Sequence, residues 1–128
     1  KLLGPRSHRE SLAFQLGSDV NVIILPKEQH AGGTTKYPVK LFEYIRAHRH
    51  VLAVAPEGLS AGLIQQLNMG IVVDPENHDA IASSILTLFH RWKRGALGAV
   101  KIDENILDRF SRRSVTRELA SLFDKVVK

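Results

Sequence analysis

The sequence predicts an α/β fold of Rossmann-like type, with three α/β/α layers and a mostly parallel sheet. Short apolar runs alternate with helical patterns along the chain, which is typical of βαβ units. The runs are rich in β-branched residues, and Pro26 and Pro56 end two of them. The 128 residues, 44% hydrophobic and 24% charged, have the size and balance of one globular domain. In such sheets ligands bind beyond the carboxyl ends of the strands, so we expect any site at that edge.

The first part of the chain predicts two helices and a strand. Ser7 and Glu10 have the spacing of a capping box, which indicates a helix over 7–16. Residues 20–25 are rich in β-branched side chains and predict a buried strand, followed by a polar loop over 26–37. Pro38 suits the first turn of the next helix, because its missing amide is not needed there. The expected inner face of this helix consists of Leu41, Phe42 and Ile45.

The second part predicts two more strands, at 51–55 and 71–73, separated by a helix with leucine and isoleucine at helical spacing. Asn77 is the expected N-cap of the following helix, after a turn over 74–77. The apolar stripe of that amphipathic helix is Ile81, Ile85, Leu88, Phe89 and Trp92. A loop over 91–98 and a short helix over 103–110 follow. The last helix repeats the spacing with Val115, Leu119, Leu122, Phe123 and Val126.

The composition limits the kinds of site and partner that the chain can have. Without cysteine there is no disulfide and no thiolate metal site, which suits a reducing compartment. The net charge of +5 favours nucleic acid, a phospholipid surface or a phosphorylated small molecule, although an ordinary solvated surface explains it equally well. No apolar run is long enough to span a membrane and no signal peptide opens the chain, so we expect a cytoplasmic protein. The chain starts without Met, on what resembles a strand end, and we expect a fragment.

The most informative segment is a glycine-containing loop and the helix after it. Gly32 and Gly33 let backbone amides approach a ligand, and the helix directs its positive end at the loop, a geometry that suits diphosphate. Lys40 and Glu43 share one side of the helix, where the lysine can meet phosphate and the carboxylate can bind sugar or ribose hydroxyls. A flexible loop with an ordinary Lys–Glu surface pair explains the same spacing. The loop is neither a Walker motif nor a Gly-x-Gly-x-x-Gly turn.

The same region resembles a known enzyme family. Residues 37–45, followed by Val-Leu-Ala at 51–53, are similar to the P-x-K-x-x-E-Y segment and next strand of group 1 (family 4) retaining glycosyltransferases, which have the GT-B fold. Leu3-Gly4 before a capped helix, Ser-Asp-Val at 18–20 and the run at 69–75 resemble further passages of that family. The resemblance covers nearly the whole chain. It implies that residues 1–128 are a partial C-terminal, nucleotide-sugar-binding domain, without an upstream βα unit and the N-terminal acceptor domain.

The resemblance also implies a donor site. Glu43 matches the family glutamate that holds the nucleotide ribose, whereas the family's earlier glutamate falls at Thr35, which supplies no charge. Arg49-His50 stands where the family usually has Gly-x-Pro. The Arg–Lys pair with which the family neutralises the leaving diphosphate has no counterpart in this chain. The implied donor-binding residues are Glu43, Lys40, Gly32, Gly33, Thr34, Thr35, Leu3 and Gly4.

Under this resemblance, the full-length protein transfers a sugar from a nucleotide-diphosphate sugar to an acceptor with retention of configuration. Stabilisation of the leaving diphosphate by loop amides and the helix terminus needs no metal or other cofactor. The implied partners are the nucleotide sugar, the N-terminal domain of the same chain, and a glycan or lipid-linked acceptor. Peripheral contact with the inner face of a membrane is compatible with such acceptors, and no motif indicates nucleic acid. The isolated chain is expected to be inactive.

Other functions stand beside this one. A non-catalytic Rossmann-like module that binds a phosphorylated ligand, or a degenerate scaffold domain, is favoured by Thr35. A receiver-type signalling domain is disfavoured, because the strand ends lack an acidic cluster. The six histidines have no partners at metal-ligand spacing. His30, next to Gly32 and Gly33, remains a candidate contact for the ligand. The basic–aromatic run at 91–94 is explained most simply as the end of an apolar stripe and a helix C-terminus.

Overall fold

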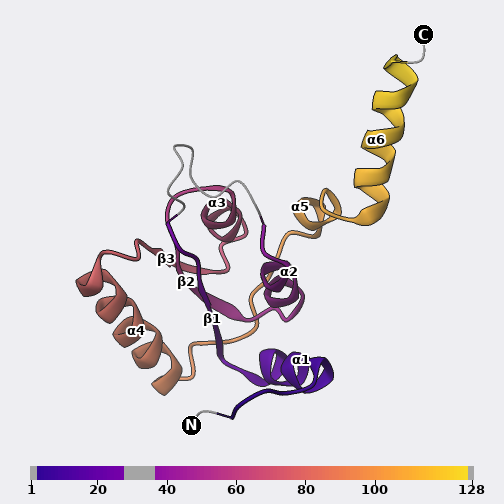
Figure 1. Cartoon of the computed structure of the whole chain (residues 1–128). Helices are drawn as coiled ribbons and strands as arrows, with labels where there is room; N and C mark the ends of the chain where they lie inside the picture. The colour runs from indigo at the N-terminus through magenta and orange to yellow at the C-terminus, as the bar shows by residue number, and fades with distance from the viewer. Residues whose placement is uncertain (1–2, 28–36, 127–128) are drawn as a thin grey trace.

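The computed structural model describes residues 3–27 and 37–126, which form an open parallel sheet with helices on both faces (Figure 1). The strands are β1 (Val20–Ile24), β2 (His50–Val54) and β3 (Gly70–Val73). They lie side by side in this order, and both pairs are parallel. The predicted α/β class and parallel sheet are therefore confirmed.

The register of the strands defines two edges of the sheet. Val20 pairs with His50, and Val51 pairs with Gly70, so the strands begin together at what we call the amino edge. They end together at the carboxyl edge, where Ile24 pairs with Val54. The second and third strands each begin one residue earlier than the sequence predicted.

The first helix, α1 (His8–Gly17), begins as the capping box predicts. Ser7 Oγ accepts a hydrogen bond from the Glu10 amide, and the Glu10 carboxylate accepts one from the Ser7 amide at 3.0 Å. These bonds satisfy amides that no helical carbonyl can reach. The helix lies beside the second one along the chain.

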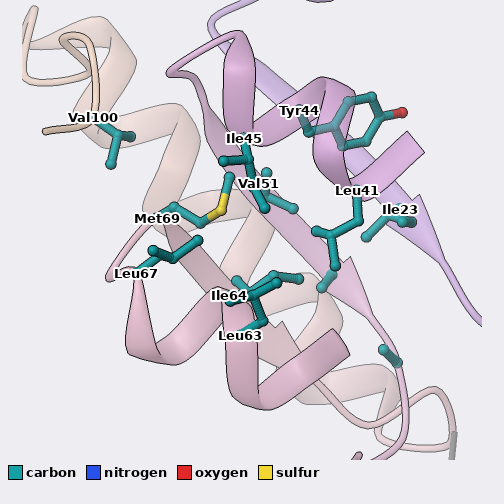
Figure 2. Packing of buried hydrophobic residues seen from close by; sticks show 12 residues of the cluster. Ile23, Leu41, Tyr44, Ile45, Val51, Leu63, Ile64, Leu67, Met69 and Val100 are labelled. Atoms are coloured by element: carbon teal, nitrogen blue, oxygen red, sulfur yellow. The ribbon is translucent and has the colours of Figure 1, made fainter. Parts of the chain in front are cut away.

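One face of the sheet carries the main core. Helices α2 (Val39–Arg46) and α3 (Leu59–Gln66) pack on it. Leu41 and Ile45 of α2 are fully buried, as predicted, and Phe42 is half-buried. Burial of a large apolar side chain contributes roughly 1.5–3 kcal/mol. Figure 2 shows these two residues meeting a cluster that includes Ile23, Val51, Leu63, Ile64, Leu67 and Met69.

The other face is covered by α4 (His78–Lys93), which packs mainly over β2 and β3. Asn77 caps this helix as predicted, since its Oδ1 accepts from the Ala80 amide at 2.9 Å. Leu88 is buried, but the predicted stripe is not buried as a whole. About half of each of Ile85, Phe89 and Trp92 is exposed. The helix also continues to Lys93, through part of the loop expected over 91–98.

Strand β1 is buried on one face only, which corrects the predicted buried strand. Ile23 is 6% exposed, whereas Val22 is 50% and Ile24 71% exposed. Successive side chains of a strand point to opposite faces, and α4 lies mainly over the other two strands. Parallel sheets normally bury both faces. In the described part of the chain, the α4 side of β1 is therefore an uncovered apolar surface.

The chain ends with α5 (Glu104–Asp108) and α6 (Arg112–Val126). The last helix has the predicted spacing, but none of its described side chains is buried and it projects away from the sheet (Figure 1). Each residue of its stripe is at least half exposed: Val115, Leu119, Leu122, Phe123 and Val126. None of the helices in residues 3–27 and 37–126 has the length and apolar character needed to cross a bilayer.

Candidate functional site

An ion-pair cluster joins two loops at the carboxyl edge of the sheet. Lys27 follows β1, whereas Asp74 and Glu76 follow β3. The Lys27 Nζ lies 2.7 Å from Glu76 Oε2 and 3.7 Å from Asp74 Oδ2. The hydrogen bond to Glu76 raises the pKa of Lys27, and the charge of Asp74 adds to this effect. The loops after the first and third strands therefore meet at one edge, as the parallel topology predicts.

The N-terminus of α2 opens on the same edge, because the helix follows β1 and returns the chain to the start of β2. Pro38 is the N-cap residue and supplies no side-chain hydrogen bond. The amide of Leu41 donates to the Pro38 carbonyl at 3.0 Å, so the first intrahelical bond begins only there. The amides of Val39 and Lys40 precede it and have no helical acceptor. They and the positive end of the helix dipole suit an external anion.

Glu43 lies on α2 about 6 Å along the helix axis from its first residue. Its side chain is half-buried, and Gln15 Nε2 of α1 donates to Glu43 Oε2 at 2.9 Å. The carboxylate thus sits where the two helices meet, outside the apolar core. An ionised carboxylate has about four acceptor positions, so most of its capacity remains after this bond.

Gln15 was not singled out by any pattern in the sequence, yet it is the residue that holds Glu43. It is 7% exposed, and its Oε1 is buried without a hydrogen-bond partner among the described residues. An unpaired buried group of this kind costs about 1–3 kcal/mol. Exchanging the two amide atoms would not remove the cost, because the oxygen would then face the Glu43 carboxylate. The available signal was a polar residue three positions after Leu12, on the same side of α1.

Lys40 lies on the same side of α2 as Glu43, but the two side chains are not paired. Lys40 is exposed, and every ion pair found among the described residues lies elsewhere. Glu43 turns toward α1 instead. The ordinary surface pair that we kept as an alternative is therefore not formed in the described part of the chain.

Leu3 and Gly4 stand just before α1. Gly4 has a φ of 69°, in the left-handed region that favours glycine, and a Cβ there would meet nothing within 4 Å. Leu3 is exposed. Among the described residues no hydrogen bond or ion pair joins Leu3 or Gly4 to α2, and the chain begins beside α1, at the end of the sheet where β1 starts (Figure 1). The structure therefore does not bring these two residues to the N-terminus of α2.

The other loop candidates, Gly32, Gly33, Thr34, Thr35 and His30, lie outside the described residues. Tyr37, the last residue of the predicted loop, is described. Its ring packs edge-on against Phe42 at 5.8 Å and against Phe110 at 5.5 Å between centroids. This aromatic cluster fixes the start of α2 against the turn between α5 and α6.

The described histidines do not gather at the candidate site. His48 Nδ1 lies 3.2 Å from the Val100 carbonyl, beside the core, and His50 begins β2 at the amino edge. Among residues 3–27 and 37–126, no three or more His, Asp or Glu side chains are arranged to hold a metal ion.

Comparison with known proteins gives no family for this chain. It matches no protein-family model, no curated protein and no solved structure. A functional proposal therefore depends on the residues at the carboxyl edge and on the resemblance of the sequence motif.

Proposed function

We propose that this chain is the donor-binding domain of a retaining glycosyltransferase of the GT-B type, with a nucleotide-diphosphate sugar as substrate. In this proposal residues 1–128 are part of a C-terminal domain. An upstream βα unit and an N-terminal acceptor domain belong to the remainder of the polypeptide.

The observation that carries the proposal is the position of Glu43 relative to the N-terminus of α2. The helix end offers amides without helical acceptors, and the carboxylate lies about one turn further along. A diphosphate at the helix end would leave its ribose within reach of Glu43. The buried and unpaired Gln15 Oε1 beside this carboxylate adds an acceptor for a ligand hydroxyl or N–H group.

The proposed transfer reaction depends on few individual side chains. The bond between the anomeric carbon and the diphosphate oxygen breaks, a bond from that carbon to the acceptor oxygen forms, and the proton of the acceptor hydroxyl passes to the released diphosphate. Negative charge grows on the diphosphate, where α2 amides, Lys40 and the 32–35 loop would stabilise it. Glu43 would hold the ribose and so orient the donor. In this scheme no metal or other cofactor is required.

Uncovered apolar surfaces support a further domain. The α4 side of β1 and the stripe of α6 both expose large apolar side chains. Exposed apolar surface of large extent is typical of contacts with another protein surface or ligand. An N-terminal domain of the same polypeptide is the partner that this function requires. A glycan or lipid-linked acceptor would bind between the two domains, in the cytoplasm or at the inner face of a membrane.

Calorimetric titration of the chain with UDP, GDP and ADP, and with their sugar conjugates, tests the proposal. We expect weak binding of at least one nucleotide diphosphate. Glu43→Ala should lower the affinity at least about tenfold, because hydrogen bonds to a charged group contribute roughly 1.5–3 kcal/mol. Glu43→Gln keeps an acceptor for Gln15 and should lose less.

A matched control is Glu118→Ala, which removes an exposed carboxylate on α6 and should leave the affinity unchanged. The far-ultraviolet circular dichroism spectrum shows whether the chain is folded. If the folded chain binds none of the nucleotides, the proposal is wrong. Equal losses for Glu43→Ala and Glu118→Ala would also exclude a site at Glu43.

The second candidate function is a non-catalytic domain that binds a phosphorylated ligand, or a degenerate transferase half with a scaffold role. Thr35 favours it, because this position carries no charge where the resembling family has a glutamate. Release or transfer of the sugar, measured on the polypeptide with both domains, distinguishes the two. Binding of the nucleotide without either reaction supports the second candidate.

A further inference from the structure

A polar cavity of about 410 Å³ lies at the amino edge of the sheet, opposite the proposed donor site. It is lined by His50 of β2, Gly70 of β3, Arg91 of α4, Ala96 and residues 98–101. Two contacts fix this segment: the Val100 amide donates to the His48 carbonyl at 2.8 Å, and the Val100 carbonyl lies 3.2 Å from His48 Nδ1. The cavity is therefore built into the fold.

Three basic residues from separate parts of the chain line this cavity. They are His50 at the start of β2, Arg91 in the last turn of α4, and Lys101 after that helix. None of the described lining residues is acidic. In the described part of the chain, all ion pairs lie elsewhere and no side-chain hydrogen bond involves Arg91 or Lys101. The positive charge of the cavity is thus uncompensated there.

The pKa of the His50 imidazole is affected by the same surroundings. Burial lowers the pKa of its imidazole, and the positive charge of Arg91 lowers it further. None of the described residues that line the cavity is a carboxylate that would offset the guanidinium charge. An anion between the two groups would oppose both effects.

The helix dipole accounts for only part of the arrangement. Arg91 lies near the C-terminus of α4, where a positive charge is favourable. His50 and Lys101 lie on other segments, so the same explanation does not cover them. Small residues at 96, 98 and 99 also leave backbone groups accessible to the cavity. A lining of this kind is typical of a ligand site.

We propose that the amino-edge cavity binds a phosphate monoester group, held by Arg91, Lys101 and His50. The arginine presents paired N–H donors that match two phosphate oxygens, and the lysine adds a mobile point charge. Two permanent positive charges balance a dianion, whereas one carboxylate would leave a charge unmatched. The cavity volume exceeds that of phosphate alone and leaves room for a small organic group. This site is separate from the proposed donor site and does not depend on it.

Nuclear magnetic resonance titration of the labelled whole chain at constant ionic strength tests the proposal. Inorganic phosphate and glycerol phosphate should cause saturable shifts in the His50 ring and in the amides of 98–101. They should also raise the ring pKa of His50, because a dianion favours the protonated imidazole. Acetate at the same concentration should cause much smaller shifts. Absence of saturable shifts at these positions overturns the proposal.

Charge-removing variants locate the site. Lys101 is exposed, so Lys101→Gln should fold normally and should weaken phosphate binding about tenfold. Arg91→Gln should weaken it at least as much. Lys93→Gln is the matched control, because this exposed residue in the last turn of α4 does not line the cavity. An equal loss with Lys93→Gln and Lys101→Gln would mean non-specific attraction and overturn the proposal, even if Arg91→Gln fails to fold.

The phosphate monoester can belong to a free metabolite or to a lipid headgroup, and vesicles distinguish these sources. Saturable phosphate binding without sedimentation on phosphatidate-containing vesicles assigns a free ligand. Sedimentation that both inorganic phosphate and Lys101→Gln weaken assigns the headgroup. Sedimentation unaffected by either, without saturable phosphate shifts, contradicts a site in this cavity. Glu43→Ala should leave phosphate binding here unchanged, so failure of the donor-site proposal is recognised separately.

Discussion

Gly62 and Gly70 are close in the sequence but differ in the space around them. Gly70 is the first residue of β3 and pairs with Val51 of β2. A Cβ at this position would overlap the Val51 carbonyl and lie 2.9 Å from its backbone nitrogen. Gly62, in α3, has nothing within 4 Å of such an atom. The close approach of two backbones therefore requires glycine at position 70 and not at position 62.

We expect Gly70→Ala to lower the free energy of unfolding by at least about 3 kcal/mol, because backbone atoms of a paired strand cannot rotate away from the added methyl group. Gly62→Ala is the control and should raise it by roughly 0.5–1 kcal/mol, the helix preference of alanine over glycine. Urea unfolding followed by circular dichroism measures both. Similar stabilities for the two variants would show that the strands can move apart at Gly70.

The capping box of α1 predicts a pH dependence. Hydrogen bonds from Ser7 lower the pKa of Glu10 below its ordinary value of 4.5. The ionised form is thus favoured by folding, and its contribution is complete above pH 4.5 and is lost as the pH falls through the lowered pKa. Glu10→Gln keeps the hydrogen bonds without the charge. We expect the wild-type urea midpoint to exceed that of Glu10→Gln near neutral pH, and the two to converge in acid. A difference that persists below the lowered pKa would contradict this.

Local spacing explains which residue roles the sequence could predict. The Ser7–Glu10 box and the Asn77 cap were predicted because their partners lie three residues away. The partner of Glu43 is Gln15, 28 residues earlier, and no spacing rule relates the two. The same holds for Lys27 and Glu76, 49 residues apart. Contacts that depend on how helices and loops meet in space follow only from the fold.

At the scale of elements, the kind of each segment was easier to predict than its burial. Period and β-branching identified all three described strands and the helices between them, with small shifts at their ends. Burial depends on which other element covers a face. The stripe of α6 and the outer residues of β1 have buried-type patterns, yet they are largely exposed in the described chain, and the stripe of α4 is buried only in part. An apolar stripe predicts that a helix packs against another surface, but it does not indicate which surface.

The exposure of α6 leads to a truncation experiment. None of its described side chains is buried, so a chain that ends at Ser111 should keep its free energy of unfolding within about 0.5 kcal/mol. The helical circular dichroism signal should fall, because the helix itself is lost. Solubility should rise with removal of the apolar stripe. A large fall in the urea midpoint would show that α6 packs against the rest of the protein.

At the scale of the whole molecule, the parallel sheet separates two polar regions. The carboxyl edge carries Lys27 with its two carboxylates, together with the N-terminus of α2. The amino edge carries the cavity with Arg91 and Lys101. The expectation of a site at the carboxyl edge followed from parallel topology. The amino-edge cavity could not be predicted, because it forms where the segment after α4 returns beneath His48.

In the proposed function a nucleotide diphosphate binds at the N-terminus of α2 with its ribose near Glu43. The most direct test maps amide and side-chain shifts of the labelled chain during titration with the nucleotide that binds in calorimetry. We expect saturable shifts at residues 38–43 and at the Gln15 side-chain amide, and we expect Glu43→Ala to abolish them. Shifts confined to the amino edge, or undiminished in that variant, would contradict it.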